Sequence, residues 1–199
     1  MKYSMRGNVD PFIVMDVMEI ARKAEESGRK IIHMEVGQPS TAAPSGALER
    51  TSQIIKSNPL GYTVALGLPE LRKKISDLYG RWYNLDLDPS RVIVTSGSSG
   101  AFILSFTALF EEGARVGIGA PGYPSYRQIL KSLGISPVDI VTTVKNKFQP
   151  TAKDVVSQNL DGLLVASPSN PTGTMSSKHE LADLIAASHS IGANFISDE

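Results

Sequence analysis

The sequence predicts an α/β fold built around a mainly parallel sheet. After Pro89, short β-branched runs alternate with helical stretches, a pattern typical of βαβ units. With 41% hydrophobic and 20% charged residues, the 199-residue chain has the composition of an ordinary globular protein. The runs expected to form strands are residues 92–95, 116–118, 138–141, 163–165 and 195–196.

The N-terminal part of the chain predicts two helices and one strand. Asp10 and Pro11 fit an N-cap and a first helical position, and apolar residues then recur at helical spacing until Gly28. Residues 31–36 alternate with a period of two, which predicts a strand. A second helical stripe covers residues 68–82.

The domain organisation follows from this change of pattern along the chain. We expect residues 1–44 to form an N-terminal arm and part of a smaller domain, and residues 45–199 to form the N-terminal part of a large domain. The last predicted strand, 193–196, is followed by three residues only, so no helix covers it. This predicts that the chain belongs to a longer protein.

Composition excludes several classes of function. Twenty basic residues balance twenty acidic ones without a basic tract, so we expect neither nucleic-acid nor membrane partners. The absence of cysteine excludes disulfides, thiolate metal sites and a cysteine nucleophile. His33, His179 and His189 have no metal-ligand spacing, which predicts no metal. Since no signal-peptide core or membrane-length apolar run is present, we expect a soluble, cytoplasmic protein.

Four polar loops follow the predicted strands, where open α/β sheets bind their ligands. The first loop, residues 95–100, contains Gly97, Ser98 and Ser99 and leads directly into an apolar helix. Small residues and hydroxyls at a helix N-terminus can donate hydrogen bonds to an anion. This loop therefore predicts a phosphate site, and a serine-rich N-cap is the alternative interpretation.

The second loop, residues 120–126, places Tyr123 and Tyr126 at a strand end where no apolar period requires them. An aromatic ring in this position can stack on a flat ligand, although simple turn packing is the alternative. The loop therefore predicts a platform for a ligand ring.

The same region also completes a Gly-x-Gly-x-x-Gly pattern. It consists of Gly117, Gly119 and Gly122, and Asp139 follows at a distance that permits a ribose contact. A dinucleotide site is therefore an alternative, but two prolines in the loop remove backbone donors that a pyrophosphate needs.

The third and fourth loops each offer one polar side chain. Asn170 lies between two prolines in the loop 167–173, so its backbone has little freedom. Asp198 directly follows a buried run, where a carboxylate is costly unless it meets a cation or a donor. Turn chemistry is the alternative for each loop alone. Together, the four loops favour a ligand with a phosphate, a flat ring, an oxygen for Asn170 and a basic nitrogen for Asp198.

The order and spacing of six segments resemble the N-terminal half of a class I/II aminotransferase of the fold-type-I, pyridoxal-phosphate-dependent family. The resemblance covers nearly the whole chain. It implies a truncated three-layer α/β/α large domain of the aspartate aminotransferase-like fold, with a mainly parallel sheet. The segments are Val36–Pro39, Gly61–Arg72, Val94–Phe102, Pro121–Tyr126, Ser167–Gly173 and Ser197–Glu199.

The resemblance also implies which residues bind pyridoxal 5'-phosphate. Gly97, Ser98 and Ser99 would hold the cofactor phosphate, and Tyr123 would stack on the pyridine ring. Asn170 would hydrogen-bond the phenolic oxygen of the ring. These roles agree with the ligand that the loops predict.

Further roles follow from the same resemblance. Asp198 would act in catalysis by pairing with the pyridine nitrogen and keeping it protonated, so that the ring withdraws electrons from the substrate. Tyr62 would reach the cofactor phosphate of a neighbouring subunit, and Gly37 would lie near the substrate carboxylate. A homodimer acting on an amino acid and a 2-oxo acid is therefore expected.

The sequence departs from the family in one important respect. It contains neither the Schiff-base lysine that follows the aspartate in family members nor their substrate-binding arginine. Lys178, after Ser176 and Ser177, is the nearest imitation, but its position predicts an exposed residue in the first turn of a helix. We therefore expect the 199-residue chain alone to be inactive.

Two alternative functions remain at this level. A carbon–sulfur lyase, decarboxylase or synthase on the same cofactor platform would share every motif named above. An effector-sensing domain of a transcription regulator would require a DNA-binding module before the first helix. Only ten residues precede that helix, which disfavours this second alternative.

Overall fold

The computed structural model describes residues 2–199, which form two compact units. One unit comprises the N-terminal segment up to Phe12 together with Gly97–Glu199, and the other comprises Ile13–Ser96. The expected division at residue 44 concerns the domains of a longer fold and stays a prediction. Within residues 2–199, none of the helices combines the length and apolar character needed to cross a bilayer.

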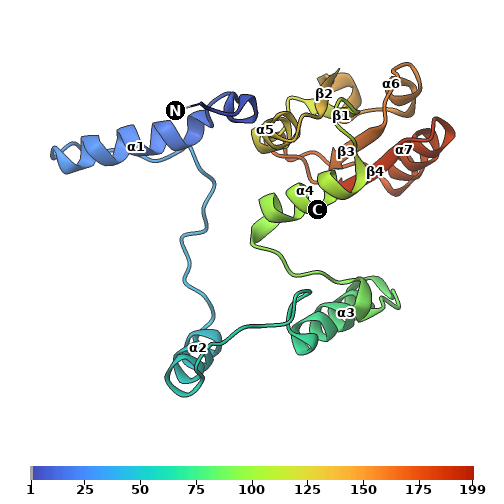
Figure 1. Ribbon diagram of the computed structural model, residues 1–199. Coiled ribbons are helices and arrows are strands. Elements are labelled where there is room, and N and C mark those ends of the chain that lie inside the picture. The colour runs from blue at the N-terminus through green and yellow to red at the C-terminus, as the bar shows by residue number, and fades with distance from the viewer. Residues whose placement is uncertain (1) are drawn as a thin grey trace. The chain divides into compact units, whose positions relative to one another are not determined.

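A four-stranded parallel sheet forms the centre of the first unit (Figure 1). Its spatial order is β2-β1-β3-β4, and Ala166 pairs with Asp198 at the carboxyl ends of β3 and β4. Four of the five predicted runs are thus confirmed as strands of a parallel sheet. The strands are β1 (Arg115–Ala120), β2 (Ser136–Val141), β3 (Gly162–Ala166) and β4 (Asn194–Asp198).

Helices cover both faces of this sheet. On one face, Phe106 of α4 (Gly97–Leu109) and Leu130 of α5 (Pro124–Ser132) are fully buried in a cluster with Val116 and Leu164. Burial of such large apolar side chains is the main favourable contribution to folding, about 1.5–3 kcal/mol for each residue.

The second face has its own apolar cluster. Val155 of α6 (Ala152–Val156) and Leu184 of α7 (Lys178–Ser190) pack there with Leu163 and Val165. Since successive residues of β3 point to opposite faces, Leu163 and Leu164 belong to different clusters. The unit therefore has three layers, α/β/α.

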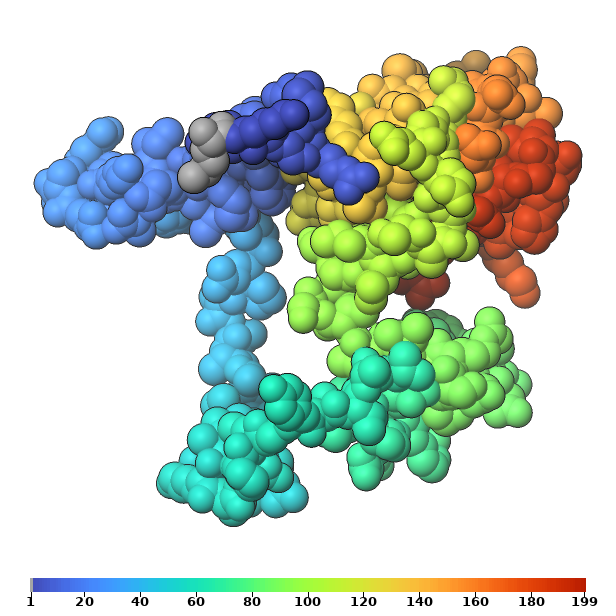
Figure 2. Space-filling view, in the orientation of Figure 1, coloured from blue at the N-terminus to red at the C-terminus, as the bar shows by residue number. Residues whose placement is uncertain are grey.

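The N-terminal segment packs against α5 (Figure 2). It contains the short helix η1 (Met5–Gly7), and the Asp10 carboxylate accepts a hydrogen bond from Lys131 Nζ at 2.8 Å. The Phe12 ring meets the Tyr123 ring edge-on at a centroid distance of 5.9 Å. Asp10 is thus an ion-pair partner of α5, and its prediction as the N-cap of the first helix was wrong.

The second unit contains three α-helices and one short 3-10 helix. Arg72 lies in the helix Pro69–Tyr83, and its guanidinium donates to the carbonyl oxygens of Pro89 and Val92, each at 2.8 Å. These bonds hold that helix against the segment that leads toward Gly97. The elements are α1 (Ile13–Glu26), α2 (Ser45–Ser57), α3 (Pro69–Tyr83) and η2 (Pro89–Arg91), while the short helix η3 (Val144–Asn146) belongs to the first unit.

Two predicted strands of the second unit were wrong. Residues 31–36 form no strand, and Ile32 and Met34 are 81% and 88% exposed. Residues 92–95 are not a strand either, and Val94 N donates a single hydrogen bond to Leu66 O at 3.0 Å. Alternation of apolar and polar residues predicts which side of a sheet each side chain would face. A strand also needs a neighbouring strand to which its backbone can hydrogen-bond.

Candidate cofactor site

Tyr126, in the first turn of α5, connects several of the predicted site residues. Its hydroxyl donates a hydrogen bond to Asp198 Oδ2 at the end of β4. Its ring is 4% exposed and packs edge-on against Tyr123 and Phe102, at centroid distances of 5.4 and 5.1 Å. Tyr126 therefore links Tyr123, Asp198 and α4 at the carboxyl edge of the sheet.

The electrostatics of this pair make Tyr126 a donor. Burial raises the pKa of the Tyr126 hydroxyl, and the hydrogen bond to the Asp198 carboxylate raises it further. The hydroxyl therefore keeps its proton throughout the physiological pH range. Asp198 Oδ2 in turn accepts the hydrogen bond from the Tyr126 hydroxyl, as expected for a carboxylate that is partly removed from water.

The backbone brings the Asn170 loop to the same place. Ser167 N donates to Asp198 O at 3.0 Å, which extends the β3–β4 pairing by one bond. The loop is then closed by Gly173 N, which donates to Ser169 O at 2.7 Å. The third and fourth predicted loops are therefore neighbours in the structure.

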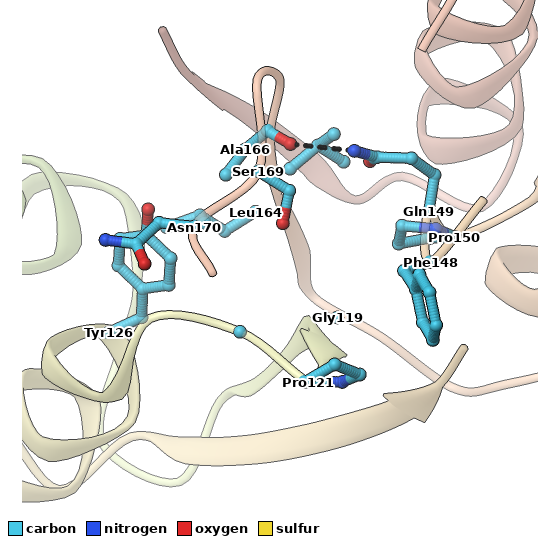
Figure 3. A pocket seen from close by; sticks show the side chains of 12 residues that line it. Gly119, Pro121, Tyr126, Phe148, Gln149, Pro150, Leu164, Ala166, Ser169 and Asn170 are labelled. Carbon is cyan, nitrogen blue, oxygen red and sulfur yellow. Dashed lines mark hydrogen bonds between the residues drawn. The ribbon is translucent and has the colours of Figure 1, made fainter. Parts of the chain in front are cut away.

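A small pocket lies between these loops and α5 (Figure 3). Asn170 and Tyr126 line it together, and Pro121 and Gly122 of the second loop contribute to its wall. The predicted convergence of the second and third loops is thus observed at the carboxyl ends of the strands.

The predicted phosphate loop lies at the N-terminus of a helix. Helix α4 begins at Gly97, whose φ of +75° favours glycine. No heavy atom lies within 4 Å of the position that a Gly97 Cβ would take, and the first turn carries no acidic residue. Ser98 and Ser99 are exposed in that turn, where the helix dipole favours a negative charge.

The glycine pattern around the second loop is explained by packing. A Cβ on Gly117 would lie 2.9 Å from Leu160 Cδ1, and a Cβ on Gly122 would lie 2.4 Å from Gly119 O. Asp139, the candidate ribose ligand, pairs with Arg127. The dinucleotide alternative is therefore not needed to account for these residues.

Gly37 and Tyr62 belong to the second compact unit. Both are exposed in the structure. Their expected contacts with the substrate carboxylate and with the neighbouring subunit's phosphate stay predictions.

Lys178 occupies the position that its sequence context predicts. It is the first residue of α7 and is exposed. Ser177 caps this helix reciprocally with Glu180: Ser177 N donates to Glu180 Oε2 at 2.6 Å, and Glu180 N donates to Ser177 Oγ at 3.3 Å. The serine next to Lys178 therefore has a structural role.

The sequence patterns place Tyr126 in the predicted ring platform but do not predict its bond to Asp198, and they assign no role to Gln149, although both residues line the pocket. Tyr126 had a visible signal, because a second aromatic residue follows Tyr123 by three positions at the start of a helix. Gln149 had none, since a single glutamine before a proline is typical of an exposed loop.

Residues 29–199 match the family model of the class I and II aminotransferases. The chain therefore belongs to this family, whose members depend on pyridoxal phosphate. The three-layer, aspartate aminotransferase-like fold expected from the sequence is confirmed by its structural relatives.

Two curated relatives match the full length of this chain. Valine–pyruvate aminotransferase from Mycobacterium tuberculosis is 40% identical over 200 residues, which make up 52% of that protein. Aspartate aminotransferase from Geobacillus stearothermophilus is 29% identical, again over 52% of its length. The chain thus spans about half the length of the curated relatives it matches.

Solved structures show the same proportions. A Silicibacter pomeroyi protein assigned as an aminotransferase is 58% identical with a TM-score of 0.90, and the match covers all of this chain and 51% of that one. An aminotransferase from M. tuberculosis is 40% identical with a TM-score of 0.95, covering all of this chain and 52% of that one.

Proposed function

We propose that this chain supplies the cofactor-binding part of a pyridoxal-phosphate-dependent aminotransferase, which moves an amino group between an amino acid and a 2-oxo acid. The observation that carries the proposal is the Tyr126–Asp198 pair beside the Asn170 loop. A protonated pyridine nitrogen needs a negatively charged hydrogen-bond acceptor beside it, and the Asp198 carboxylate can supply one. Family membership supports the same conclusion.

The residues present fit the cofactor. The N-terminus of α4, with Ser98 and Ser99, offers backbone and hydroxyl donors to a phosphate, and Gly97 leaves room beside them. Tyr123 supplies a ring for stacking, and the Asn170 amide supplies a hydrogen bond to the phenolic oxygen. When bound, the pyridinium ring acts as an electron sink for the substrate carbanion.

Asp198 has the central part in this proposal. Tyr126 donates to Oδ2, which orients the carboxylate, and the carboxylate would accept a hydrogen bond from the protonated ring nitrogen. A negative charge next to that nitrogen raises its pKa and keeps the proton in place. Asp198 would thus keep the proton on the pyridine nitrogen, while Tyr126 keeps Asp198 in position.

The remaining parts of the site are proposed on the resemblance alone. Tyr62 would bind the phosphate of a neighbouring subunit, which requires a homodimer, and Gly37 would contact the substrate carboxylate. A cytoplasmic location and a role in amino acid biosynthesis complete the proposal. Valine and pyruvate are the first substrates to test, because the relative from M. tuberculosis is named for them.

Substitutions test the proposal in the polypeptide that the complete reading frame encodes. Asp198→Ala should retain the cofactor but lower turnover by about 10²–10³-fold, because the negative charge next to the ring nitrogen is lost. Ser98→Ala with Ser99→Ala should instead weaken cofactor binding by about 10–100-fold, because two donors to the phosphate disappear.

Cofactor occupancy is measured by absorbance, and turnover by formation of the new amino acid. Wild-type turnover in a cofactor-loaded Asp198→Ala variant would refute the role of this residue. Release of ammonia, carbon dioxide or a thiol in place of amino transfer would favour the lyase, decarboxylase or synthase alternative.

A further inference from the structure

Gln149 is a buried polar residue next to the candidate site. Its side chain is one of four polar side chains buried among residues 2–199, and the residue is 5% exposed. Its Nε2 donates to Ala166 O at 3.1 Å and to Thr174 O at 3.0 Å, and the first of these bonds is drawn in Figure 3. An amide is buried at a cost unless its donors are satisfied, and these two bonds satisfy them.

The two acceptors flank the loop that carries Asn170. Ala166 is the last residue of β3, and Thr174 follows the loop directly. Thr174 O also accepts a hydrogen bond from Ser169 N at 2.9 Å. One side-chain amide thus joins the beginning and the end of the loop 167–173.

The backbone that carries Gln149 has an unusual conformation. Lys147 and Phe148 both have a φ of 54°, in the left-handed region that non-glycine residues rarely adopt. The turn is closed by Phe148 N, which donates to Thr143 O at 2.8 Å, and by Gln149 N, which donates to Asn146 O at 3.0 Å. Two adjacent residues in this region are unfavourable, so the surrounding contacts must hold them there.

The turn directs the Gln149 side chain toward the loop. Phe148, Gln149 and Pro150 form one wall of the pocket, and Ser169 and Asn170 form another (Figure 3). Gln149 therefore lies across the pocket from the residue expected to bind the phenolic oxygen. Its hydrogen bonds go to the two ends of the loop, at Ala166 and Thr174.

We propose that Gln149 is a positioning residue of the cofactor site, which fixes the loop 167–173 and thereby presents the Asn170 amide to the cofactor. This inference rests on the proposed function. Without the Gln149 amide, the carbonyl groups of Ala166 and Thr174 lose a shared donor. The bond from Ser169 N to Thr174 O remains, but the beginning and the end of the loop are then held less firmly. The Asn170 hydrogen bond would then be formed less often, so cofactor affinity would fall.

A double-mutant cycle tests the inference in the polypeptide that the complete reading frame encodes. Gln149→Met keeps the length of the side chain but removes the donors, and Asn170→Ala removes the group that it is expected to position. The dissociation constant of pyridoxal phosphate, measured by absorbance titration, is the readout. Each single variant should weaken binding about tenfold, and the double variant should bind no more than about twofold more weakly than Asn170→Ala.

A matched control separates positioning from a general loss of stability. Asn194→Leu removes another amide donor, which binds Leu109 O at 3.2 Å and lies at the amino end of β4. It should leave cofactor affinity within twofold of the wild type. Equal weakening in this variant would overturn the inference, because any lost amide bond would then have the same effect.

A second variant covers the case in which Gln149→Met does not fold. Gln149→Glu keeps the shape, and its protonated form retains one donor while its charged form repels both carbonyl oxygens. Its cofactor affinity relative to the wild type should therefore fall as the pH rises through the range in which the carboxyl group ionises. A constant ratio would overturn the inference.

The outcomes also distinguish the inference from the function on which it rests. A wild-type protein that fails to bind pyridoxal phosphate contradicts the proposed function and, with it, this inference. Weaker binding by Asn170→Ala together with unchanged binding by a folded Gln149→Met contradicts the inference alone. Additive effects in the double variant do the same, since they show that Gln149 acts independently of Asn170.

Discussion

The Tyr126 hydroxyl donates a hydrogen bond to the Asp198 carboxylate, although the two residues are 72 positions apart in the chain. This bond joins the first turn of α5 to the last residue of β4, and Phe102 of α4 packs on the same tyrosine ring. Three elements of the α/β unit therefore meet at the Tyr126 side chain. The orientation of that carboxylate depends on a donor from a different βα loop.

Tyr126→Phe removes this donor and keeps the aromatic packing. Because hydrogen bonds to charged groups contribute more than neutral ones, we expect the free energy of unfolding to fall by about 1.5–3 kcal/mol. Turnover in the complete enzyme should fall about tenfold, with the cofactor still bound. Urea denaturation and amino-transfer assays measure the two effects. Tyr79→Phe in α3 is the matched control, and equal effects in both variants would contradict the role of Tyr126.

Lys178 should not bind the cofactor covalently. It is exposed at the start of α7 beside a complete capping box, so Lys178→Ala should leave cofactor affinity unchanged. Borohydride treatment of the 199-residue chain with pyridoxal phosphate should label no unique lysine. Mass spectrometry checks this result, and a specific adduct at Lys178 that Asp198→Ala abolishes would show that the prediction is wrong.

Gly117 should be required for packing. An alanine Cβ there would meet Leu160 Cδ1 at 2.9 Å and Ile140 Cδ1 at 3.0 Å, so Gly117→Ala should destabilise the protein by about 1–3 kcal/mol. Gly46→Ala is the control, because apart from its chain neighbours and the backbone of α2 itself no heavy atom lies within 4 Å of its Cβ position. It should stabilise the protein by up to about 1 kcal/mol. Urea denaturation distinguishes the two outcomes, and similar midpoints would refute the packing argument.

His33 should stabilise the second unit at acidic pH. Its Nδ1 lies 2.6 Å from Glu35 Oε1 and its Nε2 lies 3.1 Å from Glu25 Oε1. The hydrogen bond to Glu35, followed by that to Glu25, raises the pKa of His33 above its usual value of 6.5. The stabilisation is therefore complete below pH 6.5 while the two carboxylates are ionised, and it is lost as the pH rises through the raised pKa of His33 in the folded state.

A comparison with His33→Gln measures this dependence. The difference in melting temperature between the two proteins should shrink as the pH rises, and NMR titration should show a lower His33 pKa in Glu35→Gln. A His33 pKa that is unchanged by Glu35→Gln would contradict the assigned ion pair.

The hydrophobic pattern determined the positions of most elements. Runs such as 163–165 became strands because they are buried on both faces, and α3 follows its apolar stripe closely. The loops after these runs could also be placed, since parallel strands bring their carboxyl ends to one edge. Asn170 and Asp198 could therefore be placed at that edge from local sequence alone, whereas Gly97 follows residues 92–95, which form no strand. The cofactor roles of these residues stay predictions.

Only the tertiary structure shows which segments pair and which polar side chains meet. Residues 31–36 have the period of a strand but no neighbouring ladder, and Asp10 has the chemistry of a cap but pairs with Lys131. The bonds from Tyr126 to Asp198 and from Gln149 to the Asn170 loop join segments that are far apart in sequence. Such contacts depend on how strands pair and helices dock. A hydrophobic period records which face is buried, but it does not record which polar group that burial brings within hydrogen-bond distance.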